Sequence, residues 1–139
     1  MSEGSVRRWR LLGAGTAALA GLFHLVGGVN GFADATSTGN IFGQEAVWVV
    51  PGFFLVLGSF QVIWTWATLK EHEVMIGLGT VAFLASIVLY LVAVVTPLPL
   101  GVKQQPLTPV AVIVKIIEAV YVTGSIALIM GLSRKTTVN

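Results

Sequence analysis

The sequence predicts an all-α membrane protein whose single domain is a bundle of four antiparallel transmembrane helices. Three observations predict this fold. The 139-residue chain is 55% apolar and only 10% charged, whereas soluble domains carry about 25% charged residues. Four apolar stretches, separated by polar connections, are each long enough to cross a bilayer. Most basic residues outside these stretches lie at the two termini and in the second connection. Four spans place these three segments on the same side of the membrane, and such an excess of lysine and arginine is typical of the cytoplasmic side.

The four predicted spans occupy most of the single domain, residues 1–139, and cover residues 11–32, 46–69, 74–96 and 109–132. Three basic residues precede the first span, one lies in the second connection and two follow the fourth span. Only Lys103 lies in a connection on the opposite side. Because cytoplasmic segments are enriched in lysine and arginine, we expect both termini in the cytoplasm.

The first span follows a basic segment that contains Arg7, Arg8 and Arg10. A cleaved signal peptide is the alternative, because Ala33 and Ala35 have the small-x-small spacing of a cleavage site. The apolar run is longer than the apolar region of about 7–15 residues found in signal peptides. We therefore expect a retained transmembrane helix.

Small residues recur along one face of this first helix. They are Gly13, Ala17, Gly21 and Gly28, and His24 lies on the same stripe. Such a stripe lets a second helix approach closely. We expect it to pack against another helix of the bundle, and a dedicated dimerisation face is the alternative.

The second span carries Trp48 near its start and Trp64 and Trp66 near its end, as expected for rings at the two membrane interfaces. Pro51 is expected in the first turn or so, where its missing N–H would have no helical partner anyway. Gln61 is the one strongly polar side chain of the span. We expect it to form an interhelical hydrogen bond that contributes about 1 kcal/mol or less.

The connections predict how the helices follow one another. Residues 70–73 form so short a link that the second and third helices must be antiparallel neighbours. His72 in this link is expected to be solvated, and a metal site is the alternative. Pro97 ends the third span, while Thr108 before Pro109 combines a capping hydroxyl with proline at the first helical position.

The fourth span contains Lys115 and Glu118, whose spacing of three puts both on one face, directed away from lipid. At about 1.5 Å of rise per residue, His24 and Glu118 lie at the same depth in the outer half of the bundle. Tyr90 and Lys115 lie slightly further out by the same reckoning. The sequence therefore predicts a buried polar cluster of His24, Tyr90, Lys115 and Glu118 with Glu118 at its centre.

Two interpretations of this cluster remain open. In the structural one, Lys115 extends its long stem to the outer surface, and Glu118 is protonated or bonded to His24 or Tyr90. In the functional one, the cluster binds a ligand, relays a proton or receives a charged group from a partner, because ionisable residues inside membranes usually serve function.

Several chemistries are not expected. The chain has no cysteine, which excludes disulfides and thiolate chemistry. His24 and His72 fall on opposite sides of the bilayer, so they cannot together ligate a haem, although two copies of His24 in a homodimer could. No nucleotide-binding, zinc-protease or nucleophile motif occurs. We expect no cofactor, no metal, no nucleic-acid partner and no catalysis by this chain alone.

Four short motifs spread over most of the chain carry a family resemblance: GLFHLV in the first span, SFQVIW in the second, TPLPLG after the third and KIIEAV in the fourth. In these the chain resembles a loosely defined group of small four-helix prokaryotic integral membrane proteins of uncharacterised activity. The resemblance implies the four-helix fold and implies no activity.

The first functional hypothesis is a non-catalytic accessory or structural subunit of a larger complex in the plasma membrane, of the respiratory or oxidase type. Small size, the absence of catalytic motifs and a small-residue face that invites neighbouring subunits or a second copy all favour it. The alternative is a free-standing module that binds a ligand, or lets protons or small molecules permeate, through His24 and Glu118. A third hypothesis is an enzyme acting on lipid or quinone, with His24 and Glu118 as acid and base.

Overall fold

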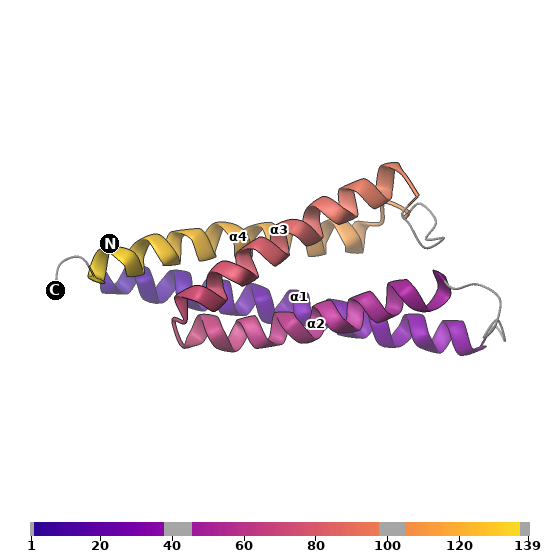
Figure 1. The fold of residues 1–139 in the computed structure, drawn as a ribbon, viewed down its shortest axis with the longest axis horizontal. Coiled ribbons are helices and arrows are strands. Elements are labelled where there is room, and N and C mark those ends of the chain that lie inside the picture. Colours follow the sequence, from indigo (N-terminus) through magenta and orange to yellow (C-terminus); the bar gives the residue numbers. More distant parts are fainter. Residues whose placement is uncertain (1, 38–45, 98–104, 137–139) are drawn as a thin grey trace.

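A computed structural model describes residues 2–37, 46–97 and 105–136, which form four helices (Figure 1). They are α1 (Glu3–Ser37), α2 (Ala46–Leu69), α3 (Glu73–Val95) and α4 (Pro109–Thr136). All four are long and apolar enough to cross a membrane. The prediction of an all-α fold with four such helices is confirmed. Much of the first and third predicted connections, at 38–45 and 98–104, lies outside the described residues.

The helices match the predicted spans closely except for α1, which begins before and ends after residues 11–32. Its first turn is stabilised where the backbone N–H groups of Ser5 and Val6 donate to the carbonyl of Ser2. The predicted span ended where apolar residues ended. Helix formation does not stop there, because arginine and alanine are strong helix formers whether or not lipid surrounds them.

Consecutive helices run in opposite directions, so the two ends of the chain lie together at the left of Figure 1. We call this the terminal end and the opposite one the far end. Helix α1 packs against α2 and α4, and α3 packs against α4 and more lightly against α2. The α3–α4 pair lies close to the α1–α2 pair at the terminal end and diverges from it towards the far end (Figure 1).

Helices α1 and α2 approach closely because small residues face each other between them. A Cβ atom on Gly21 would lie 3.1 Å from the carbonyl oxygen of Gly58. One on Gly28 would lie 2.7 Å from Leu55 Cδ2 and 3.0 Å from the carbonyl oxygen of Pro51. Gly13 also faces α2, because a Cβ atom there would lie 3.4 Å from Thr68 Cγ2. The glycines of the small-residue stripe thus face α2 of the same chain, and Ala17 on the same stripe is fully buried.

Pro51 lies inside α2 rather than in its first turn. The prediction that its missing N–H would have had no helical partner is therefore wrong, because a residue there would donate to the carbonyl four residues back. The proline ring instead packs on α1, where a Cβ atom on Gly31 would lie 2.8 Å from Pro51 Cγ. Glycine at position 31 makes room for this ring.

The terminal end is closed by a helix cap and an ion pair. The N–H groups of Glu71 and His72 donate to the carbonyls of Thr68 and Ala67, and Glu71 adopts a left-handed backbone with φ of 56°. This is the Schellman arrangement that satisfies the last carbonyls of a helix. The Glu71 carboxylate also accepts a 2.8 Å hydrogen bond from Arg10, which connects this turn to α1.

Apolar side chains fill the bundle between the terminal end and its middle. Val6, Ile76, Leu128 and Leu132 form one buried cluster near the termini. A second cluster lies deeper and consists of Ala17, Ala20, Trp64, Phe83 and Tyr121. The Phe83 and Tyr121 rings stack with centroids 4.1 Å apart. This half of the bundle is a packed core.

The close approach of α1 to α2 leads to a stability prediction. Gly28→Ala should lower the free energy of unfolding by about 1–3 kcal/mol, because the added methyl group meets Leu55 and the Pro51 carbonyl. Gly15→Ala is the matched control on the same helix, since nothing lies within 4 Å of a Cβ atom there. Thermal unfolding in detergent micelles measures both. Equal melting temperatures for the two variants would contradict the packing described.

Candidate functional site

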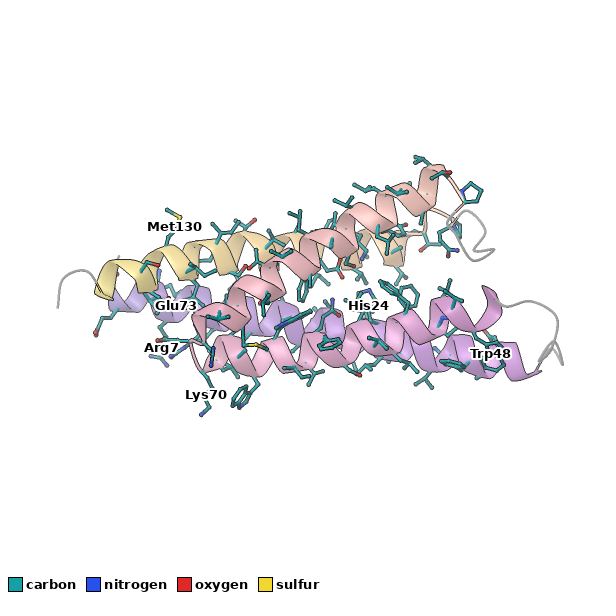
Figure 2. All side chains as sticks on the ribbon, viewed as in Figure 1. Arg7, His24, Trp48, Lys70, Glu73 and Met130 are labelled. Atoms are coloured by element: carbon teal, nitrogen blue, oxygen red, sulfur yellow. The ribbon has the colours of Figure 1, made fainter. Side chains whose placement is uncertain are left out.

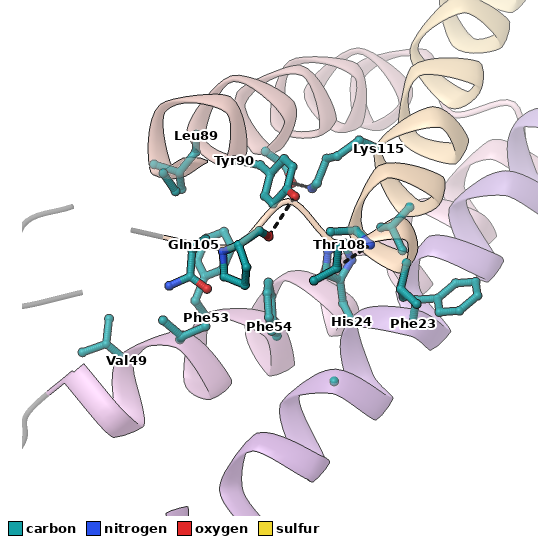
Figure 3. A pocket seen from close by; sticks show the side chains of 18 residues that line it. Phe23, His24, Val49, Phe53, Phe54, Leu89, Tyr90, Gln105, Thr108 and Lys115 are labelled. Atoms are coloured by element: carbon teal, nitrogen blue, oxygen red, sulfur yellow. Dashed lines mark hydrogen bonds between the residues drawn. The ribbon is translucent and has the colours of Figure 1, made fainter. Parts of the chain in front are cut away.

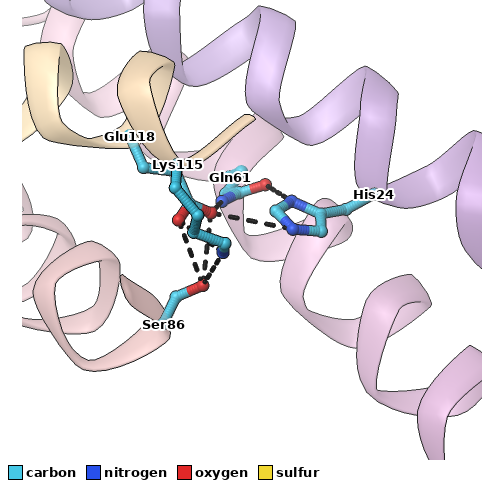
Figure 4. A network of polar contacts seen from close by, with 5 residues as sticks. All are labelled: His24, Gln61, Ser86, Lys115 and Glu118. Carbon is cyan, nitrogen blue, oxygen red and sulfur yellow. Dashed lines mark hydrogen bonds and ion pairs between the residues drawn. The ribbon is translucent and has the colours of Figure 1, made fainter. Parts of the chain in front are cut away.

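A carboxylate lies fully buried where the packed core ends. Glu118 of α4 is 0% exposed. Its Oε1 accepts hydrogen bonds from Gln61 Nε2 at 3.1 Å and from Ser86 Oγ at 3.2 Å, and its Oε2 lies 2.6 Å from Lys115 Nζ (Figure 4). Helices α2, α3 and α4 thus each contribute a donor. The carboxylate is well satisfied as an ionised, acceptor-only group.

Lys115 points into the bundle and does not extend to the outer surface. Its side chain is 16% exposed, and its Nζ donates to Ser86 Oγ at 2.8 Å as well as to Glu118. The Ser86 hydroxyl in turn donates to the carboxylate. Lys115 Nζ also lies 5.6 Å from the centre of the Tyr90 ring, within the range of a cation–π contact. The ammonium group is held in place from α3 and α4.

His24 of α1 completes the cluster through Gln61. It is 5% exposed, and its Nδ1 lies 2.8 Å from Gln61 Oε1. Because the Gln61 amide nitrogen donates to Glu118, its oxygen must accept, so His24 Nδ1 carries the proton of this hydrogen bond. His24 Nε2 lies 3.7 Å from Glu118 Oε1. That distance is too long for a hydrogen bond but allows an ion pair when the ring is protonated.

The structure brings together three of the four residues predicted for the cluster, namely His24, Lys115 and Glu118. Tyr90 contributes its ring to the surroundings of Lys115, but its hydroxyl donates to the carbonyl of Pro106 at 3.5 Å. The Tyr90 hydroxyl therefore stays outside the hydrogen bonds around Glu118.

Two members of the cluster were missing from the predicted set. Gln61 is fully buried and bonds both His24 and Glu118, and Ser86 is buried between Lys115 and Glu118. Their common signal in the sequence is a polar side chain near the middle of an apolar span. Selecting every polar side chain at the depth of Glu118 would have included both residues. The prediction considered only ionisable residues and tyrosine for the cluster, so it omitted them.

A pocket of about 500 Å³ adjoins the cluster on its far-end side, between the diverging helix pairs (Figure 3). All four helices line it. His24, Ser86 and Lys115 reach it from the cluster, whereas Glu118 does not. Aromatic and aliphatic side chains form most of the remaining wall, among them Phe53, Phe54, Leu89, Ala93, Ala111 and Val114.

This arrangement favours binding over acid–base catalysis. Glu118 is shielded from the pocket and already holds donors from three helices, so it can position Lys115 but cannot reach a bound molecule. Lys115 is the charged group that faces the pocket from the cluster. No group of three or more metal-ligating side chains occurs within residues 2–37, 46–97 and 105–136. His72 is exposed in the turn before α3.

The burial of the ion pair predicts strong coupling between its members. Glu118→Gln and Lys115→Met should each lower the free energy of unfolding by about 3–5 kcal/mol, because each leaves one buried charge without its partner. The double variant Lys115→Met/Glu118→Gln should recover most of that loss, since no unpaired charge remains. Unfolding of all four proteins in detergent measures the coupling.

The Arg10–Glu71 pair serves as the matched control for this cycle. Its two side chains are both 31% exposed, and its atoms are 2.8 Å apart. Removing either member should change stability by about 1 kcal/mol or less, because water screens the pair. Coupling at Lys115 and Glu118 as weak as at Arg10 and Glu71 would mean that the cluster is hydrated rather than buried.

Comparison of the chain with protein-family models, with curated proteins and with solved structures finds no match. The geometry of the polar cluster and its pocket is therefore what carries functional inference for this protein.

Proposed function

We propose that this protein is a membrane-embedded binding module that takes up a small apolar or amphipathic molecule between its helices. The observation that carries this proposal is the apolar pocket that ends on the Lys115 ammonium group. Its volume of about 500 Å³ falls within the range of about 300–1,000 Å³ typical of small-molecule sites. An apolar wall with one charged group is also the usual composition of such sites.

The packing on the other side of the cluster supports binding rather than permeation. Phe83 and Tyr121 are fully buried and stack on each other on the terminal side of Glu118. Ile76 and Leu128 are also fully buried nearer the termini. A permeating ion would have to cross this packed apolar core, where an unpaired charge is very unfavourable.

Access from the lipid phase fits the same proposal. Phe53 of α2 and Leu89 of α3 both line the pocket and are 40% and 39% exposed. Of the main helix contacts, that between α2 and α3 is the least extensive. We propose that a lipid-dissolved molecule enters between these two helices, so that it never has to leave an apolar medium.

A second candidate is an accessory subunit of a larger membrane complex, such as a respiratory or oxidase assembly. Helix α3 supports it, because α3 is the most apolar of the four helices and the one its own chain covers least. Val74, Val81, Val88 and Val95 recur on it every seven residues, and all are exposed. A neighbouring subunit or a second copy could pack on this row as readily as lipid does.

We further propose that the terminal end faces the cytoplasm and that the membrane is the plasma membrane. Arg7, Lys70 and Glu73 lie at the terminal end and Trp48 lies near the far end (Figure 2). Basic residues at one end of a bundle favour the cytoplasmic side. The resemblance to prokaryotic membrane proteins supports the plasma membrane.

Filling the pocket should strongly weaken binding. Ala111→Phe places a ring in the pocket, whereas Ala119→Phe places the same ring on an exposed position of the same helix. Native mass spectrometry of gently solubilised protein should find a small molecule on wild type and Ala119→Phe, at least about tenfold depleted on Ala111→Phe.

The same spectra distinguish the two candidate functions. Equal retention of a small molecule by both phenylalanine variants would contradict binding in the pocket. A further protein subunit on all three proteins would instead support the accessory role. Bare chains throughout would count against both proposals.

The orientation is tested by labelling, since the chain has no cysteine of its own. Ser2→Cys and Leu107→Cys introduce thiols at exposed positions near the terminal and far ends. A membrane-impermeant maleimide should label Leu107→Cys in intact cells and Ser2→Cys only after permeabilisation. The reverse pattern would place the termini outside and contradict the proposal.

A further inference from the structure

The Lys115 ammonium group offers a hydrogen-bond donor to a molecule in the pocket. The Lys115 ammonium group has three N–H donors. Glu118 Oε2 and Ser86 Oγ accept from two of them, at 2.6 and 2.8 Å. Within residues 2–37, 46–97 and 105–136 the third N–H has no hydrogen-bond acceptor, which leaves it for a molecule in the pocket that Lys115 lines. A cation with a spare donor in an apolar site favours a negatively charged acceptor.

The rest of the pocket wall is mostly apolar and suits the hydrocarbon part of a ligand. Phe54 and Leu89 are typical of its wall. Two of the hydroxyl groups there already have partners, because Thr108 accepts from the N–H of Ala111 and Tyr90 donates to Pro106. A ligand with one small charged head and a long apolar body therefore matches the pocket better than one with several polar groups.

An anion in this pocket changes the charge balance of the cluster. Lys115 and Glu118 neutralise each other at 2.6 Å. A bound anion would add one uncompensated negative charge in a poorly hydrated site. The polar and charged side chains around His24 and Lys115 are Gln61 from α2, Ser86 and Tyr90 from α3, and Glu118 from α4. Within this group, His24 is the one that can add a positive charge near neutral pH.

The position of His24 suits this role. Its Nδ1–H is engaged by Gln61 Oε1 at 2.8 Å, so Nε2 is the atom that gains or loses a proton. Nε2 lies 3.7 Å from Glu118 Oε1, and the ring lines the pocket. An imidazolium there would therefore face both the resident carboxylate and the incoming anion.

We propose that the ligand is a long-chain amphiphile with a single anionic head, that Lys115 binds this head, and that His24 takes up a proton at Nε2 as the ligand enters. This inference rests on the proposed binding function. In it Glu118 is a positioning residue, which holds the Lys115 ammonium group at the floor of the pocket.

The test uses hexadecanesulfonate and hexadecanol as probes, titrated calorimetrically into the full chain in lipid nanodiscs, with empty nanodiscs as the partition baseline. The sulfonate stays ionised throughout, so any proton taken up must go to the protein. At pH 6 it should bind at least about tenfold more tightly than the alcohol. Buffers that differ in ionisation enthalpy should report uptake of a proton on binding.

The pH dependence has a defined sign. Because the complex holds one more proton than the free protein, sulfonate affinity should fall as the pH rises, by up to about tenfold per unit between roughly pH 6 and 8. His24→Gln should remove this pH dependence of sulfonate affinity and the proton uptake that accompanies binding. Lys115→Met/Glu118→Gln should bind both probes with similar affinity.

Each failure has a separate meaning. Equal binding of sulfonate and alcohol by wild type would overturn the anionic head and leave the binding function standing. If wild type binds the sulfonate with an affinity independent of pH and takes up no proton, the proposed role of His24 is wrong. This outcome is measured on wild type alone and does not depend on the folding of a variant. Binding of neither probe above the baseline would overturn the proposed function itself.

Discussion

The structure depends on satisfying one carboxylate far from water. An isolated ionised carboxylate in an apolar interior is very unfavourable, and Glu118 is fully buried. Gln61, Ser86 and Lys115 supply its donors from three helices, and His24 of α1 joins through Gln61. These bonds exist only when each helix is turned to one angle about its axis. The polar layer therefore restricts the rotation of all four helices, in addition to the close glycine contacts between α1 and α2.

The two halves of the bundle on either side of this layer differ. Towards the termini the interior is filled by apolar clusters, and the Arg10–Glu71 pair closes the end. Towards the far end the helix pairs diverge (Figure 1). The pocket lies between them there (Figure 3). The cluster lies at the boundary, where Glu118 is shielded and Lys115 still reaches the cavity. A charge fixed from the packed side and presented to the open side is suited to binding.

Much of the fold was predictable because membrane spans are long and their interiors exclude charge. Four apolar stretches predicted four helices, and α2 begins and ends at the predicted residues. Helix α1 was predicted too short. The length of an apolar stretch indicates only the part of a helix that crosses the bilayer, and α1 continues beyond that part at both ends. Pro51 was also misjudged: it is the sixth residue of α2, which begins at Ala46 as predicted, and only the first four N–H groups of a helix lack a helical partner.

For the site, the sequence by itself determined depth: a constant rise per residue brings His24 to the level of Glu118, and charge inside an apolar span marks Lys115 as needing a partner. Only the tertiary structure decided rotation and divergence. Rotation joined Gln61 and Ser86 to the cluster and turned the Tyr90 hydroxyl towards Pro106. Divergence of the helix pairs opened the pocket. Both result from side-chain packing between helices, and this packing cannot be predicted from the position of a residue along its own helix.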